Sequence, residues 1–310
     1  MLDKYCKIEY KLGIMILAKK LKYGDKIGII SPSHVAEKEH YFKIFEGIKS
    51  IGFDTIEGKN LYKDTYGYIA SEQERADDFN DMILNNEVKM VFFGGGTGSN
   101  EIIPLLNYYS IKKIPKIICS YSDGTTILNT IYSQTGLIVY YGQTPGIFDG
   151  LSFYDHNQFF SNFVDENILY FSKNSEWKII NAGIGNGILI GGYTQNMALL
   201  IGSKYFSFDK KEKYILFLEN HEKFDTPASI SVHLSYIVQN DIIKNISGML
   251  FGHYSEKEYP ELENCLERFG KRNNIPVIKC DDFGHGINHG VIPIGQKVRL
   301  DTDKEILEYI

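Results

Sequence analysis

The chain has 310 residues, of which 43% are hydrophobic and 23% charged, and its formal net charge is −6. These values are ordinary for a soluble globular protein, and the length favours two domains over one. The negative charge and the absence of a run of Lys and Arg argue against a nucleic-acid partner. No apolar run in the sequence approaches the roughly 20 residues that a membrane helix needs. The N-terminal stretch is too weakly apolar and too charged for a secretory leader, so we expect a cytoplasmic protein.

The four cysteines do not indicate a disulfide or zinc framework. Cys6, Cys119, Cys265 and Cys280 have no paired spacing, and two of them lie in apolar, strand-like runs. We therefore expect reduced cysteines that pack as small hydrophobic side chains. Residues 1–14 precede the first regular pattern and are expected to form a loose extension.

Buried strands alternate with amphipathic helices in the first half of the chain. The expected strands are 26–30, 53–57, 88–93 and 117–119, with helical stripes between them. One of these helices begins with a capping box, since Glu74 follows Ser71 at the required spacing. The alternation predicts an α/β fold whose mostly parallel sheet, flavodoxin-like or Rossmann-like, is covered by helices on both faces.

The second half is expected to form a smaller α/β, β-rich domain. Residues 146–176 are aromatic, polar and without periodicity, and we interpret them as a connector. Strand-like runs then follow at 187–192, 214–218, 248–251, 276–280 and 297–300, with helical stripes between several of them. The predicted organisation is therefore an N-terminal domain at 15–145, the connector, and a C-terminal domain at 177–310.

A serine lies at a predicted strand–turn–helix junction. The apolar run 117–119 leads into Ser120-Tyr121-Ser122-Asp123-Gly124, and a helical stripe follows. This is the layout of a nucleophile elbow, in which small flanking residues allow a sharp turn and the following N–H groups face any negative charge beside the serine. Ser120 and Gly124 are those small residues. From these residues alone, the simpler alternative is favoured, namely that Ser122 or Asp123 only caps the helix.

A glycine-rich loop follows the strand at 88–93. It reads Gly-Gly-Gly-Thr-Gly-Ser from Gly94 to Ser99, so phosphate binding must be considered. The spacing matches neither a P-loop, since no Lys follows the last glycine, nor a clean Rossmann fingerprint at the first strand. The same glycines could instead let a backbone N–H approach a reacting carbonyl beside Ser122, at the carboxyl edge of the sheet.

Two polar residues of the second half could take part in chemistry. Glu219 ends the apolar strand at 214–218, where it could be a surface residue or a buried partner for a histidine. His285 lies in a loop between two glycines, where exposure to solvent is more common than a catalytic role. These residues alone leave both alternatives open.

The loop that carries His285 could also suggest a metal site. His285, His289, Asp281 and Asp282 are close in sequence. Residues four apart face one another only on a helix, and three glycines at 284, 286 and 290 argue against a helix here. We therefore expect neither a metal nor another cofactor.

Four blocks follow one another in order from about residue 20 to the C-terminus. They are Gly-Asp-Lys-Ile-Gly-Ile-Ile-Ser-Pro-Ser at 24–33; Gly-Gly-Thr-Gly-Ser-Asn at 95–100 with Tyr-Ser-Asp at 121–123, Thr-Gly-Leu at 135–137 and Tyr-Gly at 141–142; Ile-Leu-Phe-Leu-Glu at 215–219; and Asp-Phe-Gly-His at 282–285 with Ile-Pro-Ile-Gly at 292–295. In order and content, these blocks resemble the serine peptidases that include the murein L,D-carboxypeptidases and the microcin C self-immunity proteins.

The resemblance implies a catalytic triad and an oxyanion hole. Ser122 would be the nucleophile, His285 the general base and acid, and Glu219 the residue that orients the imidazole. The backbone N–H groups of Asp123 and Gly96 would form the oxyanion hole. This chemistry needs no cofactor, because the base removes the serine proton and the carboxylate holds the base in the right tautomer. The resemblance also suggests a homodimer.

The resemblance leaves two classes of substrate open. Ser120 replaces the family's usual glycine, and Thr97 stands where many of its carboxypeptidases carry an aromatic residue. The run at 248–252 and the Asp-Phe-Gly-His form lean toward the self-immunity branch. The expected substrate is a small peptide cleaved near its C-terminus, either at the L,D bond of a murein tetrapeptide or at the linkage of a microcin C-like peptide-nucleotide. The alternatives are a non-catalytic two-domain protein that binds a small ligand, and a family member that has lost activity.

Overall fold

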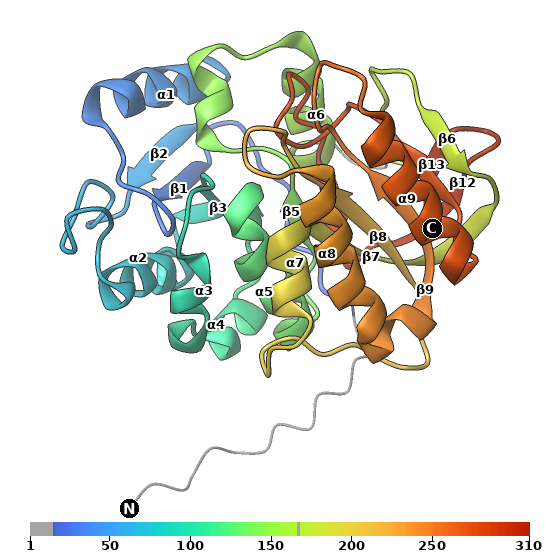
Figure 1. The fold of residues 1–310 in the computed structure, drawn as a ribbon. Helices are drawn as coiled ribbons and strands as arrows, with labels where there is room; N and C mark the ends of the chain where they lie inside the picture. Colours follow the sequence, from blue (N-terminus) through green and yellow to red (C-terminus); the bar gives the residue numbers. More distant parts are fainter. Residues whose placement is uncertain (1–14, 166–167) are drawn as a thin grey trace, which may run out of the picture.

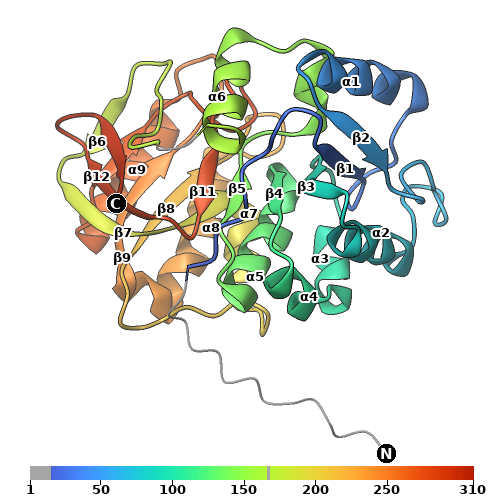
Figure 2. The same cartoon turned by 180° about the vertical axis from the view of Figure 1, so that it is seen from behind.

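The structure, a computed structural model, describes residues 15–165 and 168–310 (Figure 1, and from behind in Figure 2). The loose extension predicted for residues 1–14 lies outside the described residues. Two β-sheets carry the architecture, each flanked by helices. The α/β class predicted from the alternating strands and helices is confirmed.

The first sheet contains most of the N-terminal strands. Its order is β11-β5-β4-β3-β1-β2, and neighbouring strands from β5 to β2 are parallel, whereas β11 is antiparallel to β5. The strands are β1 (Lys26–Ile30), β2 (Asp54–Glu57), β3 (Val88–Phe93), β4 (Ile117–Ser120), β5 (Val139–Tyr141) and β11 (Ile292–Ile294). β11 comes from the C-terminal part of the chain, so it departs from the predicted division at 146–176. That division stays a prediction.

Helices cover both faces of this sheet, because successive strand residues point to opposite sides. In β3, Met90 and Phe92 pack into one core and Val91 and Phe93 into another. The first core is closed by α1 (Lys38–Ser50), the 3-10 helix η3 (Pro145–Asp149) and α6 (Phe153–Phe163), and the second by α2 (Glu72–Leu84), α3 (Ser99–Ile102), η1 (Ile103–Leu105), α4 (Tyr108–Lys113) and α5 (Thr125–Thr135). The capping box predicted from Ser71 and Glu74 is present at the start of α2.

The second sheet has the order β13-β12-β7-β8-β9-β10-β6, and its central strands β7 to β10 are parallel. Its strands are β6 (Lys178–Asn181), β7 (Ile184–Tyr193), β8 (Tyr214–Glu219), β9 (Ile246–Phe251), β10 (Val277–Lys279), β12 (Lys297–Asp301) and β13 (Ile306–Tyr309). The connecting helices are α7 (Thr194–Leu200), α8 (Pro227–Gln239), η4 (Asp241–Asn245) and α9 (Pro260–Asn273).

Helix α5 joins the two sheets. It packs against β4 and β5 on one side and against β7 and α7 on the other, near the centre of Figure 1. Asn129 in the middle of α5 is fully buried and hydrogen bonds both backbone groups of Gly191 in β7, at 2.7 and 3.1 Å. One continuous apolar core therefore runs from the first sheet through α5 into the second, and this core fixes the two sheets relative to each other.

The prediction that residues 146–176 are irregular is wrong for residues 153–163, which form α6. Ser152 caps this helix by accepting a hydrogen bond from the N–H of Asp155. Its buried face recurs at helical spacing but includes Gln158 and Asn162 beside Phe159. Because these polar side chains are satisfied by hydrogen bonds inside the protein, the helix has no purely apolar stripe for a periodicity argument to find.

The cysteines of the described residues pack as small hydrophobic side chains. Cys119, Cys265 and Cys280 are free and buried, as predicted, while Cys6 lies outside the described residues. Burial raises the pKa of the Cys280 thiol well above its ordinary value, so this thiol stays protonated.

In the described part of the chain, no helix combines the length and the apolar character that crossing a membrane requires.

Candidate active site

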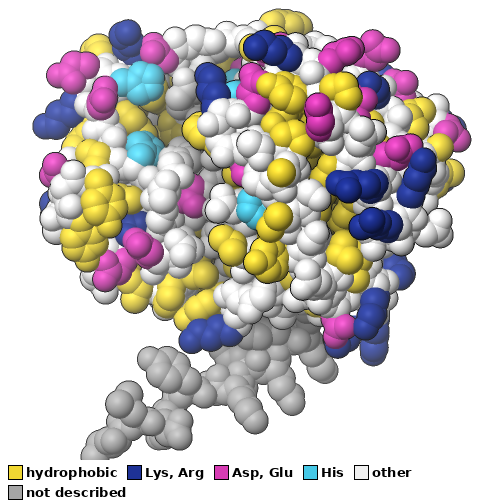
Figure 3. Space-filling view, viewed as in Figure 1, with side chains coloured by type: hydrophobic (Ala, Val, Ile, Leu, Met, Phe, Trp, Pro, Cys, Tyr) yellow, Lys and Arg dark blue, Asp and Glu magenta, His cyan; other side chains and the backbone are white. Residues whose placement is uncertain are grey.

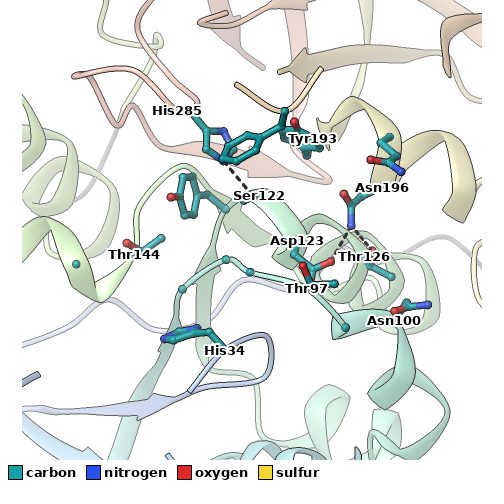
Figure 4. A pocket seen from close by; sticks show the side chains of 18 of the residues that line it. His34, Thr97, Asn100, Ser122, Asp123, Thr126, Thr144, Tyr193, Asn196 and His285 are labelled. Atoms are coloured by element: carbon teal, nitrogen blue, oxygen red, sulfur yellow. Dashed lines mark hydrogen bonds between the residues drawn. The ribbon is translucent and has the colours of Figure 1, made fainter. Parts of the chain in front are cut away.

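The carboxyl ends of strands from both sheets border a single cleft. β3 ends at the glycine loop, β4 at the Ser122 turn and β7 at Tyr193, and residues from all three places line a space of about 1110 Å³. Figure 3 shows the face of the molecule that holds this cleft, and Figure 4 shows the residues inside it. Ligands of open α/β sheets bind at such carboxyl edges, so the cleft is the candidate active site.

Ser122 stands at the apex of the predicted turn in a strained backbone conformation. Its φ is 54°, in the left-handed region that residues other than glycine rarely adopt. The turn is so tight that a methyl group on Gly124 would lie 2.3 Å from the Oγ of Ser120. The capping alternative is wrong, since the N-cap of α5 is Gly124, no side chain caps the helix, and the Asp123 carboxylate bonds elsewhere.

Glu219, His285 and Ser122 form a continuous series of hydrogen bonds. The distance from His285 Nε2 to Ser122 Oγ is 3.0 Å, and that from His285 Nδ1 to a carboxylate oxygen of Glu219 is 2.9 Å. Glu219 is fully buried, so it is not the surface residue of the simpler alternative. With its proton on Nδ1, a neutral imidazole donates to the carboxylate and accepts from the serine hydroxyl.

Aromatic rings enclose the imidazole of His285. The ring centroids of Tyr121, Tyr193 and Phe224 lie 4.8, 5.3 and 5.8 Å from its own. Only 12% of the His285 side chain is exposed as a result. A low-dielectric surrounding strengthens the hydrogen bonds on both sides of the ring, and Figure 4 shows the ring of His285 directed toward Ser122.

Two residues that sequence reasoning did not single out hold the turn in place. The buried Tyr141 hydroxyl accepts the N–H of Ser122 at 2.9 Å and donates to Glu219 at 2.5 Å. Burial, together with the Glu219 charge, raises the pKa of Tyr141 well above its ordinary value, so the phenol remains a donor. Thr125 Oγ1 donates to the carbonyl of Ser122 and accepts the N–H of Tyr193 in β7. No local motif marks these contacts, because Tyr141 is 19 and 78 positions from Ser122 and Glu219, and Thr125 is 68 positions from Tyr193.

The glycine loop lies directly beside Ser122. A methyl group on Gly95 would be 2.6 Å from the Cβ and 3.2 Å from the Oγ of Ser122. Gly96 has a φ of 143°, and a methyl group there would be 2.0 Å from the carbonyl oxygen of Ser33, so only glycine fits. The N–H of Gly96 belongs to the peptide unit that starts at Gly95, and this unit therefore borders the serine.

Buried polar contacts anchor the C-terminal end of the glycine loop. Arg75 of α2 is buried and donates to the carbonyls of Pro32 and Gly98 at 2.8 and 2.9 Å. The next residue, Ser99, donates its N–H to the Asp123 carboxylate and its hydroxyl to the Asp123 carbonyl. The loop and the Ser122 turn are thus one hydrogen-bonded unit, which restricts the movement of the backbone N–H groups between them.

Gly95→Ala is expected to lower the kcat of a reaction at Ser122 by about a hundredfold. The added methyl group must displace Ser122 or the loop, and a displacement of about 1 Å can cost that much. Steady-state kinetics with thermal unfolding as a check on folding would measure this. Gly202→Ala is the matched control, since nothing lies within 4 Å of a methyl group at that position. Wild-type kcat in Gly95→Ala would contradict the close approach of the loop to the serine.

The four residues of the metal alternative point to different partners. His285 faces Ser122 and Glu219, and His289 pairs with Asp155 at 3.0 Å. Asp282 accepts from Trp177 and from the N–H of Asn174, and Asp281 contacts His253 and Lys279. Across residues 15–165 and 168–310, no group of three or more His, Cys, Asp or Glu side chains could hold a metal ion.

Comparisons with known proteins agree with this architecture. Residues 27–142 match the LD-carboxypeptidase N-terminal domain and residues 186–300 the LD-carboxypeptidase C-terminal domain. The Escherichia coli microcin C7 self-immunity protein MccF is 28% identical, with 94% of each chain covered. A Bacillus subtilis protein named "Probable murein peptide carboxypeptidase" is 25% identical, covering 92% of this chain and 91% of its own.

Solved structures share the fold. An MccF-like protein from Bacillus anthracis superimposes with a TM-score of 0.84 at 24% identity, covering 95% of this chain and 99% of its own. MccF in complex with aspartyl sulfamoyl adenosine superimposes with a TM-score of 0.81 at 24% identity, with 95% and 98% covered. Both matched domains follow one another in the same chain and together span more than half of it. The protein belongs to the LD-carboxypeptidase family.

Proposed function

We propose that the protein is a serine peptidase that hydrolyses an amide near the C-terminus of a small peptide. The supporting observation is the 2.9 and 3.0 Å series from Glu219 through His285 to Ser122, at a strained turn that opens into the cleft. A weak hydroxyl nucleophile needs this arrangement, in which a base takes its proton and a third group orients the base. A protein that only bound a ligand would have no use for it.

The proposed reaction proceeds in two steps. Ser122 Oγ attacks the carbonyl carbon while its proton moves to His285 Nε2, and the oxyanion is held by the N–H groups of Asp123 and Gly96. His285 then protonates the leaving nitrogen as the C–N bond breaks, which leaves an ester on Ser122. Water then attacks this ester with His285 again as base. The acid product is released and the serine hydroxyl is restored.

The charges that line the cleft favour one of the two candidate substrates. Glu37 and Asp123 are acidic, and the described residues that line the cleft include no lysine or arginine. A phosphate group would find no lysine or arginine there, whereas an ammonium group of a peptide could pair with the exposed Glu37, since Asp123 is buried and already bonded to Ser99 and Asn196. We therefore propose a peptide with a cationic side chain, such as a murein tetrapeptide cleaved at its L,D bond, as the first substrate to test.

A microcin C-like peptide-nucleotide is the second candidate. Phe224 is 69% exposed at the cleft, and an exposed aromatic ring can stack on a nucleobase. MccF itself has been solved with a sulfamoyl adenosine ligand.

Incubation with each compound in the presence of EDTA, followed by mass spectrometry, would identify the substrate. Labelling of Ser122 by a fluorophosphonate would separate either peptidase from a binding protein, which should not react. The homodimer suggested by the resemblance stays a prediction for analytical ultracentrifugation.

Glu219→Gln is expected to lower kcat by roughly 10⁴-fold with little change in KM, since the orienting carboxylate acts on the base and not on substrate binding. Steady-state kinetics would measure both constants. Glu212→Gln, just before the same strand and on the surface, is the matched control. If Glu219→Gln kept more than about a tenth of wild-type kcat, the carboxylate would have no part in the mechanism.

A further inference from the structure

We propose that Tyr141 is a positioning residue of the active site. Its single hydroxyl group holds the serine turn and the Glu219 carboxylate in fixed positions relative to each other. This inference rests on the proposed peptidase function. Tyr141 ends β5 of the first sheet, and Glu219 ends β8 of the second. Their hydrogen bond therefore crosses from one sheet to the other, and the same hydroxyl contacts the backbone N–H of the serine.

The contacts of Tyr141 complete a closed ring. The N–H of Ser122 donates to the Tyr141 hydroxyl at 2.9 Å, and that hydroxyl donates to Glu219 Oε1 at 2.5 Å. Glu219 Oε2 bonds to His285 Nδ1 at 2.9 Å, and His285 Nε2 returns to Ser122 Oγ at 3.0 Å. The backbone and the side chain of the nucleophile thus lie at the two ends of one hydrogen-bonded path.

The carboxylate needs the hydroxyl for its orientation. Each of its oxygens has a different partner, Tyr141 on Oε1 and His285 on Oε2. With both bonds in place, rotation about the last side-chain bond of Glu219 would break both of them. With the imidazole as its only side-chain partner, the fully buried carboxylate would be free to turn with the ring it is supposed to hold.

The serine turn needs the hydroxyl for a second reason. Ser122 has a φ of 54°, a conformation that persists only where surrounding contacts enforce it. The hydroxyl of Tyr141 is a side-chain acceptor for its N–H. Tyr141 is itself fully buried, and its ring packs 5.5 Å from that of Phe217, so the hydroxyl has a fixed position.

Tyr141→Phe removes only this hydroxyl. We expect kcat to fall by about tenfold to a hundredfold, the effect of losing a hydrogen bond to a charged group, while KM changes by less than about threefold. The KM value is expected to hold because Tyr141 is not among the residues that line the cleft. The labelling rate constant of Ser122 with a fluorophosphonate should fall in parallel with kcat.

Tyr140→Phe is the matched control. Tyr140 is the preceding residue of β5 and is buried against the opposite face of the sheet, where its ring packs 5.1 Å from that of Phe163. The amplitude of labelling reports the fraction of folded, competent sites, so it separates a slower site from a misfolded protein. A purely structural role of Tyr141 would lower the amplitude and leave the rate constant of the remaining sites unchanged.

A double-mutant cycle tests whether Tyr141 acts through Glu219. In the Glu219→Gln background, Tyr141→Phe should lower kcat by less than it does in the wild-type background, because the part that acts through the carboxylate is already lost and only the support of the Ser122 N–H remains. A full loss in that background, or an unchanged kcat in Tyr141→Phe alone, would overturn the inference. Ser122→Ala is measured alongside. Activity in that variant would overturn the proposed function itself, whereas its inactivity beside an unaffected Tyr141→Phe would overturn the inference alone.

Discussion

Ser122→Ala is expected to lower kcat by on the order of 10⁶-fold, the loss that follows removal of the nucleophile from a serine triad. The physical reason is that no other hydroxyl is bonded to His285 Nε2 among the contacts of this site. Fluorophosphonate labelling should disappear together with the activity. The fold should be unchanged, because among the described residues the Ser122 side chain hydrogen bonds only to His285, while the turn is held through its backbone.

The measurement is product formation by mass spectrometry over long incubations, together with thermal unfolding. Ser235→Ala on the exposed side of α8 is a suitable control, since this hydroxyl only donates to the carbonyl of Ser231 in its own helix. Retention of more than about a tenth of wild-type turnover by Ser122→Ala would rule out a covalent mechanism at this serine.

His285→Ala is expected to reduce kcat by a similar factor, on the order of 10⁶, since an unactivated serine hydroxyl is a poor nucleophile. The effects of the two substitutions should not add. A Ser122→Ala/His285→Ala double variant should be about as slow as either single variant, because the residues act as one unit. Additive losses, measured as kcat of all three variants, would mean that the two side chains serve separate steps.

His289→Ala is the control for the choice of histidine. This residue shares the loop of His285 but bonds to the buried Asp155 through its ring and its backbone N–H. Burial disfavours the charged carboxylate, but the hydrogen bonds and charge of His289 outweigh it and hold the pKa of Asp155 below its ordinary value. The variant should therefore lose stability, by about 1–3 kcal/mol, and keep kcat within about tenfold of wild type. An inactive His289→Ala beside an active His285→Ala would show that the wrong histidine had been chosen.

The strands of the parallel sheets could be predicted from the sequence with close boundaries. The apolar run at 88–93 matches β3, and the run at 214–218 matches β8 but for its last residue. Strands buried on both faces are apolar throughout, which makes them easy to recognise. The short strands β5, β6, β11 and β13 were not predicted. They have three or four residues each, too few to show a period of their own.

The identity of the candidate triad came from family resemblance and not from periodicity. Local patterns left a simpler alternative for each residue: a helix cap for Ser122, a surface carboxylate for Glu219 and an exposed loop residue for His285. These alternatives could not be decided locally, because the three residues are 66 to 163 positions apart along the chain. Only the pairing of the two sheets through α5 brings them within hydrogen-bonding distance.

The sequence by itself determined the α/β class, the buried parallel strands, the capping box and the small residues that permit the Ser122 turn, because each of these depends on neighbours within a few positions. The tertiary structure decided which loop histidine meets the serine, that β11 returns to the first sheet, and that Tyr141 joins the serine turn to Glu219. These outcomes depend on how two sheets pack around one shared core, and packing between distant segments leaves no periodic trace in the residues that it brings together.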